Sequence, residues 1–186
     1  MKPLPYVWIA AGILFVGATV WINYEVKVNI QAASQGGATR ELGEIRVGQP
    51  APYFSTQDPA GQTVSLADFR SHKVVVLDFW ASWCPPCKMA MPGLQRVQDD
   101  FRGRDLEILS INQDESAATA TDFMRKKGYS LHVLLDPGSE IGNRYAARSI
   151  PTLVVVDKRG LVQWIRVGYR PDDSDLRRVL ERLVKE

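Results

Sequence analysis

The feature that most constrains the fold of this chain is an apolar run that is followed closely by two cysteines. Residues Val74–Trp80 are apolar except for Asp78, as in a strand covered on both faces of a sheet. Beyond Cys84 and Cys87, apolar residues recur at helical spacing as far as Phe101. This order predicts a buried strand that delivers a C-x-x-C pair to the start of a helix.

Strand and helix patterns alternate along the rest of the chain. We expect strands near 53–57, 62–65, 74–80, 106–111, 131–135, 153–156 and 162–167. We expect helices from the cysteines to about 101, up to about 128, over 140–147 and around 176–184. Alternating elements that end in a hairpin and a helix predict an α/β sandwich with a mixed sheet.

The N-terminal segment differs from the rest in composition. Residues 6–22 carry no charge, and as a helix they would span about 25 Å, enough for a short membrane crossing. Lys2 precedes the segment, which favours an N-terminus inside and a domain outside. We expect a membrane anchor over 1–24, a linker over 25–45 and one domain over 46–186. The alternative is a cleaved signal peptide, which would also export the domain.

The number of cysteines excludes several classes of site. The chain has two cysteines and two histidines, so a disulfide scaffold or a four-cysteine zinc site cannot form. A Cys2His2 zinc site would have to use both histidines, His72 and His132. The net charge is +2 without a basic run, so the sequence does not indicate nucleic acid as a partner. We expect no metal and no cofactor other than a redox-active disulfide.

The chemistry of a C-x-x-C pair at a helix start assigns different roles to the two sulfurs. The unpaired N–H groups and positive dipole end of the helix stabilise a thiolate at Cys84, which becomes the nucleophile. Cys87 lies further into the helix, and we expect it to be less exposed. It would resolve the mixed disulfide by attacking Cys84.

The segment from Asp78 to Met89 (DFWASWCPPCKM), together with Ile150-Pro151-Thr152, resembles the thioredoxin superfamily. The segments 47–54 and 61–66 are similar to its TlpA/ResA-like branch of membrane-anchored, extracytoplasmic thiol–disulfide oxidoreductases. The resemblance covers about residues 45–185. It implies a thioredoxin-like three-layer sandwich with a mixed central sheet, an N-terminal hairpin and an extra strand–helix unit before Pro151.

The resemblance also implies a substrate-binding surface around the cysteines. Pro151 is expected in cis and facing the disulfide, which leaves the backbone of Ile150 free to pair with an extended substrate strand. Trp83 is expected to pack over the site. The substrate-binding residues are then Trp83, Pro85, Pro86, Ile150 and Pro151.

Asp78 is the expected third catalytic residue. An acid inside a buried apolar run is costly when ionised, so its pKa should be raised, and it becomes a proton acceptor for Cys87. The alternative is an inert, hydrogen-bonded acid. Asp78 itself departs from the TlpA/ResA-like branch, which often has an Asn at this position, and two further positions depart from the related families. Ala90 stands where a Glu is common, which weakens a narrow assignment to cytochrome c biogenesis. Ser110 stands where thioredoxins place a Lys, so Asp78 is expected to lack a cationic partner.

The two prolines between the cysteines indicate the direction of the reaction. Neither Pro85 nor Pro86 has an N–H to donate to the thiolate, and a less stabilised thiolate makes the disulfide a weaker oxidant. We therefore expect a reductase with a potential of about −200 to −270 mV. Its partners would be disulfide-bearing extracytoplasmic proteins and a membrane electron donor, with the domain on the periplasmic side of the cytoplasmic membrane.

Three other functions use the same residues. A disulfide oxidase or isomerase would have the same site at another potential, and an oxidising compartment favours it. A Cu(I) chaperone would bind through Cys84, Cys87, Met89 and Met91, although the two methionines should face different ways on a helix. Peroxidase activity is disfavoured because the Pro-x-x-x-Thr-x-x-Cys pattern of peroxiredoxins is absent.

Overall fold

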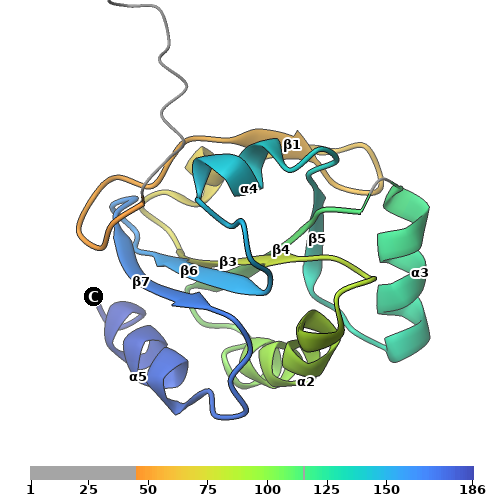
Figure 1. Ribbon diagram of the computed structural model, residues 1–186. Helices are drawn as coiled ribbons and strands as arrows, with labels where there is room; N and C mark the ends of the chain where they lie inside the picture. The colour runs from red at the N-terminus through yellow and green to blue at the C-terminus, as the bar shows by residue number, and fades with distance from the viewer. Residues whose placement is uncertain (1–44, 115) are drawn as a thin grey trace, which may run out of the picture. The chain divides into compact units, whose positions relative to one another are not determined.

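The computed structural model describes residues 45–114 and 116–186 (Figure 1). The predicted anchor over 1–24 and almost all of the predicted linker lie outside the described residues. None of the helices within the described ranges has the length and apolar character needed to cross a bilayer.

A five-stranded mixed sheet forms the centre of the domain, in the order β5-β4-β3-β6-β7. Its strands are β3 (Val74–Trp80), β4 (Leu106–Asn112), β5 (His132–Leu135), β6 (Thr152–Val156) and β7 (Val162–Val167). β3 pairs in parallel with β4 and antiparallel with β6, and β6 and β7 form an antiparallel hairpin. All seven residues of β3 are buried, as the apolar run predicts.

Elements on both faces of the sheet complete the three layers (Figure 1). The helices are α2 (Pro85–Asp100), α3 (Ala117–Lys127), α4 (Glu140–Arg144), α5 (Ser174–Leu183) and the 3-10 helix η1 (Leu66–Phe69). Apolar residues of α2, α3 and α5 share one buried cluster with Val74, Val76 and Trp80. Residues of η1 and α4 share the other cluster with Val75, Leu77 and Phe79. Because alternate strand residues point to opposite faces, β3 contributes to both cores.

The predicted N-terminal hairpin is present as β1 (Ser55–Gln57) and β2 (Thr63–Ser65), which pair antiparallel as a separate sheet. The predicted strand–helix unit between the C-x-x-C helix and Pro151 is β5 and α4. The thioredoxin-like fold is thus confirmed in its central sheet, its hairpin and its additional unit.

The helix expected over 140–147 is shorter in the structure and ends at Arg144. Tyr145, the capping residue, is buried in the core, and its hydroxyl donates to the Pro52 carbonyl oxygen at 2.6 Å. Ala146 follows with a φ of 52°, which an α-helix cannot contain. The helix stops because the anchoring of Tyr145 turns the chain toward β6.

Candidate redox site

The site is built where β3 gives way to α2. Cys84 is the N-cap of α2, and Cys84 and Cys87 are joined by a disulfide with their Cα atoms 5.3 Å apart. The Cys87 N–H points to the Cys84 sulfur, at an N···S distance of 3.2 Å. Pro85 and Pro86 occupy the first two helical positions and have no N–H. The N–H of the third position is therefore the donor that the helix start offers to this sulfur.

Both sulfurs lie below the surface. Cys84 is 3% exposed and Cys87 is 1% exposed, so the expected difference in exposure is small. Trp83, which is expected to pack over the site, directly precedes Cys84 and is 67% exposed. Pro85 and Pro86 are also exposed. A partner would therefore meet the side chains that flank Cys84 before it reached the sulfur.

The loop before β6 faces the disulfide. The Ile150–Pro151 peptide bond is cis, as the resemblance implies. The Cys84 sulfur lies 3.6 Å from the Ile150 carbonyl oxygen. On the far side of the loop, the Gly168 N–H donates to the Pro151 carbonyl oxygen at 2.7 Å. Ile150 and Pro151 are thus held between the first cysteine and the end of β7.

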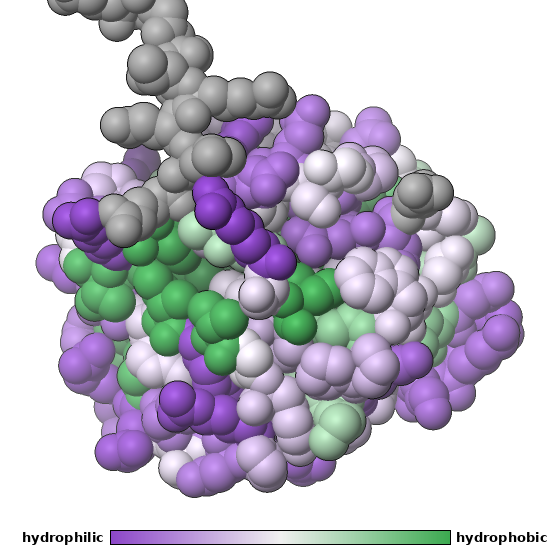
Figure 2. All heavy atoms as spheres, viewed as in Figure 1, coloured by the Kyte–Doolittle hydropathy of each residue, from purple (hydrophilic) through white to green (hydrophobic). Residues whose placement is uncertain are grey.

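Apolar surface continues from this loop to the end of β7. Figure 2 shows hydrophobic side chains gathered on the part of this face where Figure 1 places the two strands. Val167 is 60% exposed at the end of β7 and pairs in register with Thr152, next to Pro151. An exposed apolar surface beside a reactive group is typical of an interaction site.

Asp78 lies on the α2 side of β3, the side to which Trp80 and Val76 also point. Its side chain is 1% exposed, and the Ser110 hydroxyl donates to its carboxylate at 2.9 Å. Burial raises the pKa of Asp78 to about 7, although the hydrogen bond from Ser110 and the charge of Arg166 lower it. The raised pKa agrees with the expectation from the sequence, and the carboxyl group can exchange a proton near neutral pH.

The structure corrects the expectation that Asp78 lacks a cation. Ser110, at the position where thioredoxins place a Lys, is indeed paired with Asp78 in the neighbouring strand β4. The positive charge comes from the opposite flank of β3, from Arg166 in β7, two strands away in the same sheet. Arg166 is not predictable from the sequence as a partner of Asp78, because it lies 88 positions away and because no local pattern distinguishes it from other strand residues.

A second residue missed from the sequence holds the loop before Cys84. Asp114 follows β4 and is 6% exposed. Its carboxylate accepts from the Ser82 N–H at 3.0 Å, from the Ser82 hydroxyl at 3.1 Å and from the Asn112 side chain at 2.8 Å. Because β3 and β4 are parallel, their ends meet at one edge of the sheet, and this was the signal that could have found Asp114.

The side chains that a Cu(I) site would need do not all face one point. Met89 is 58% exposed, whereas Met91 is 1% exposed and packs in the same core cluster as Leu94. The two methionines thus face different ways, as their spacing predicts. Within the described part of the chain, no group of three or more His, Cys, Asp or Glu side chains is arranged to hold a metal ion.

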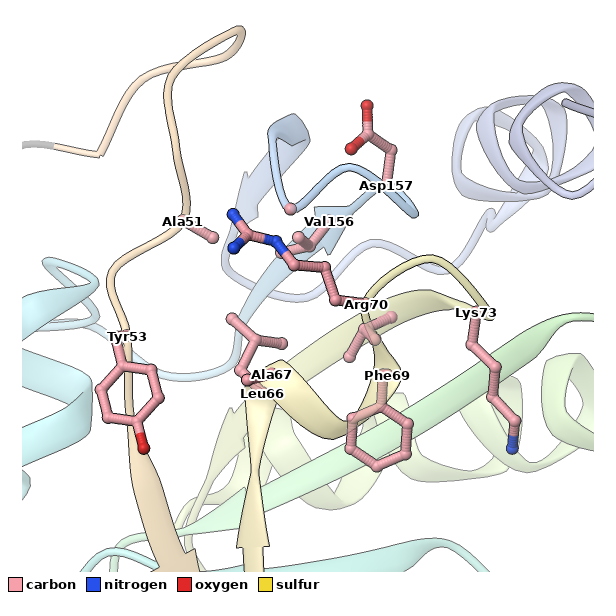
Figure 3. A pocket seen from close by; sticks show the side chains of 11 residues that line it. Ala51, Tyr53, Leu66, Ala67, Phe69, Arg70, Lys73, Val156 and Asp157 are labelled. Atoms are coloured by element: carbon pink, nitrogen blue, oxygen red, sulfur yellow. The ribbon is translucent and has the colours of Figure 1, made fainter.

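A separate pocket of about 80 Å³ lies far along the strands from the disulfide (Figure 3). It is lined by Val75 at the start of β3 and Val156 at the end of β6, whereas Cys84 follows the other end of β3. Arg70 reaches over it, and the Arg70 Nε–H donates to the Arg159 carbonyl oxygen at 3.3 Å. This pocket is not part of the redox site.

Comparisons with known proteins show a family and relatives with thiol–disulfide chemistry. The AhpC/TSA family profile matches residues 47–165. The thiol-disulfide oxidoreductase ResA of Bacillus thuringiensis is 32% identical over 128 residues, which are 69% of this chain and 73% of that protein. The ResA of Geobacillus kaustophilus is 31% identical over 139 residues, or 75% and 79% of the two chains. A Chlorobium tepidum structure, provisionally named thiol:disulfide interchange protein DsbE, superposes with a TM-score of 0.71 at 29% identity, over 76% of this chain and 99% of that one.

Proposed function

The chain belongs to the AhpC/TSA family and is a thiol–disulfide oxidoreductase, and we propose that it reduces disulfides of proteins outside the cytoplasm. The observation that carries the direction is the start of α2. Of its first three positions, two are prolines, and one N–H is directed at the Cys84 sulfur. A thiolate with few donors is a better electron donor to a substrate disulfide.

The proposed reaction has two exchange steps. The Cys84 thiolate attacks a substrate disulfide, which forms a mixed disulfide and releases one substrate sulfur as a thiolate. Asp78 then takes the proton of the Cys87 thiol. The Cys87 thiolate attacks the Cys84 sulfur, which forms the internal disulfide and releases the second substrate sulfur. Two electrons pass to the substrate, and a separate dithiol donor must reduce the enzyme again.

The surface around the disulfide supports protein substrates. Both sulfurs are buried, so a substrate must present its disulfide on a segment that fits beside Trp83 and the Ile150–Pro151 loop. We infer that Ile150 offers its backbone to an extended segment of the substrate and that Trp83, Pro85 and Pro86 contact its side chains. The exposed apolar surface at Val167 extends this area.

Equilibration with glutathione tests the direction. We expect a potential of about −200 to −270 mV for the Cys84–Cys87 pair and reduction of insulin by the full chain in the presence of dithiothreitol. A potential near about −120 mV would assign the chain to the oxidases instead.

A trapping variant tests the substrate class. Cys87→Ser leaves Cys84 able to attack but removes the sulfur that releases the substrate, so mixed disulfides with extracytoplasmic proteins should accumulate in cells. The double variant Cys84→Ser/Cys87→Ser is the matched control and should trap none. Equal recovery from both variants would contradict catalytic exchange.

We also propose that residues 1–24 anchor the domain, through a linker over 25–45, to the outer face of the cytoplasmic membrane. The uncharged segment over 6–22 supports this proposal. The full chain should stay with the membranes through alkaline carbonate extraction, whereas a chain beginning at residue 25 should be released. Release of the full chain would contradict the anchor.

A further inference from the structure

Arg166 is a buried cation on the redox side of the sheet. It is 5% exposed, and a guanidinium removed from water is stable only when other groups compensate its charge. Its Nη2 donates to the Asp173 carboxylate at 3.0 Å, and its Nη1 lies 3.6 Å from the Asp175 carboxylate. The ring of Trp164 lies 5.3 Å from the guanidinium carbon. The start of α5 thus fixes the two terminal nitrogens of Arg166.

The strand register places Arg166 in one row with Asp78. Asp78 in β3 pairs with Leu153 in β6, and Leu153 pairs with Arg166 in β7. Residues that are directly paired across neighbouring strands point to the same face of a sheet, so both charged side chains face the layer of α2 and α5. The two backbones are about 10 Å apart, which is two strand spacings. The long arginine side chain allows the guanidinium to lie closer to Asp78 than the backbone of Arg166 does.

The third nitrogen of Arg166 has no partner. Nε of Arg166 is one of three buried side-chain nitrogen or oxygen atoms in the described ranges that make no hydrogen bond. Buried donors are usually paired, because an unpaired one loses its hydrogen bond to water without replacing it. The two carboxylates of α5 hold the terminal nitrogens of Arg166, and the charge of Arg166 still acts on Asp78, whose pKa it lowers.

The redox helix makes room for the partner of Arg166. A Cβ at Gly93 in α2 would lie 2.3 Å from the Asp173 Oδ2 atom. Glycine inside a helix is less favourable than alanine, and here its missing side chain allows the Asp173 carboxylate to approach α2. The Arg166–Asp173 pair is consequently packed against the helix that carries Cys84 and Cys87.

We propose that Arg166, fixed by Asp173, is a positioning residue that keeps the Asp78 carboxylate ionised and able to accept the proton of Cys87. The inference rests on the proposed function, because it concerns the second exchange step. The proton moves from the Cys87 sulfur to Asp78, the Cys87 thiolate bonds to the Cys84 sulfur, and the substrate sulfur leaves with the bonding electrons. Arg166 takes no part in bond making and acts through its charge.

The groups that face this carboxylate on each packed element are few. Ser110 comes from β4 and Arg166 from β7, and the two cysteines at the start of α2 belong to the core cluster on this side of the sheet. Asp173 and Asp175 of α5 face Arg166. The residues that α3 contributes to this cluster are apolar. Loss of the positive charge at Arg166 should therefore raise the pKa of Asp78, and loss of the negative charge at Asp173 should lower it.

The test uses the reduced full chain and the aromatic disulfide dithionitrobenzoate in stopped flow. Attack by Cys84 releases the first thionitrobenzoate, and resolution by Cys87 releases the second. The rate of the second release should rise with pH around a midpoint near 7, the value to which burial raises the pKa of Asp78. Arg166→Met removes the cation and should move this midpoint upward by about half to one pH unit. Below the midpoint, the second release should be about three- to tenfold slower.

Two further variants separate a charge effect from a structural one. Arg166→Lys retains the cation and should keep the midpoint of the parent. Asp173→Asn removes the compensating carboxylate and should move the midpoint downward, and it gives a test even if Arg166→Met does not fold. In an Asp78→Asn background, Arg166→Met should cause no further shift.

The variants distinguish a failure of the role proposed for Arg166 from a failure of the proposed mechanism. If Asp78→Asn removes the pH dependence but folded Arg166→Met and Asp173→Asn both keep the parental midpoint, Arg166 serves only the packing of α5 and the inference is wrong. If the parent shows no second release, or if Asp78→Asn leaves its pH dependence unchanged, the proposed mechanism itself fails.

Discussion

Two buried aspartates at different places in the sheet show how differently the same side chain can be treated. Asp78 lies inside β3 near the disulfide, and Asp157 follows β6 at the turn to β7. In the described part of the chain, Asp78 accepts a hydrogen bond from Ser110 alone. Asp157 accepts from the N–H groups of Arg159 and Leu161 and from the side chains of Arg159 and Gln163.

The two pKa values move in opposite directions as a result. Burial raises the pKa of Asp78 to about 7 because one hydroxyl and a more distant arginine do not replace the lost water. Burial also acts to raise the pKa of Asp157, but the hydrogen bonds from Leu161, Arg159 and Gln163 outweigh it, and the net pKa is lowered. The number of donors and the depth of burial together distinguish a group that can exchange protons from one that holds a turn together.

The largest difference should appear in stability against pH. The folded pKa of Asp78 lies above its unfolded value of 3.8, so ionisation opposes folding. Its unfavourable contribution is absent below about pH 4, grows as the pH rises, and is complete above about pH 7. Asp78→Asn should therefore raise the free energy of unfolding of the oxidised protein above pH 7 by up to about 4 kcal/mol. Urea unfolding from pH 4 to 9 measures this, and parallel curves for parent and variant would contradict it.

The substitution that stabilises the protein at Asp78 should slow catalysis. Asp78→Asn should slow the second release of thionitrobenzoate by about a hundredfold at pH 8, because Cys87 loses its proton acceptor. The first release depends on Cys84 and should be unchanged. An equal slowing of both steps would indicate a disturbed helix α2 and not a lost proton acceptor.

Asp157→Asn should show the reverse pattern. Its folded pKa is lowered, so its contribution to stability is present above its unfolded pKa and is lost as the pH falls through the folded value. The variant should lose about 1–2 kcal/mol of unfolding free energy at neutral pH because charged hydrogen bonds become neutral ones. Insulin reduction per folded molecule should equal that of the parent. A loss of activity without a loss of stability would contradict a purely structural role of Asp157.

The smallest effect concerns single donors. Ser110→Ala removes the hydrogen bond to Asp78 and should raise the midpoint of the second release by about one pH unit. The matched control is Gln163→Ala, which leaves Asp157 with its backbone and arginine donors and should change the acid limb of the stability curve very little. Similar sensitivity of the two sites to the loss of one donor would show that donor number is not the deciding difference.

Much of the fold follows from local patterns in the sequence. The run of apolar residues predicts β3 with the bounds that the structure shows, because a strand covered on both faces has apolar side chains at nearly every position. Asp78 is the exception in β3. Gly128 ends α3 with a φ of 69°, as its place after the apolar spacing predicts. The disulfide between Cys84 and Cys87 is similarly local. By contrast, the end of α4 depends on Tyr145 reaching Pro52, far away in the sequence.

The sequence by itself thus determined the strand, the cysteine pair and the buried acid, because each depends on neighbours a few positions away. Only the tertiary structure decided what surrounds them. It placed Asp114 beside Ser82 and Arg166 in the row of Asp78. These partners are set by strand order and register, which residue patterns within one strand do not specify, and the field at a buried carboxylate depends on every charge that those pairings bring near it.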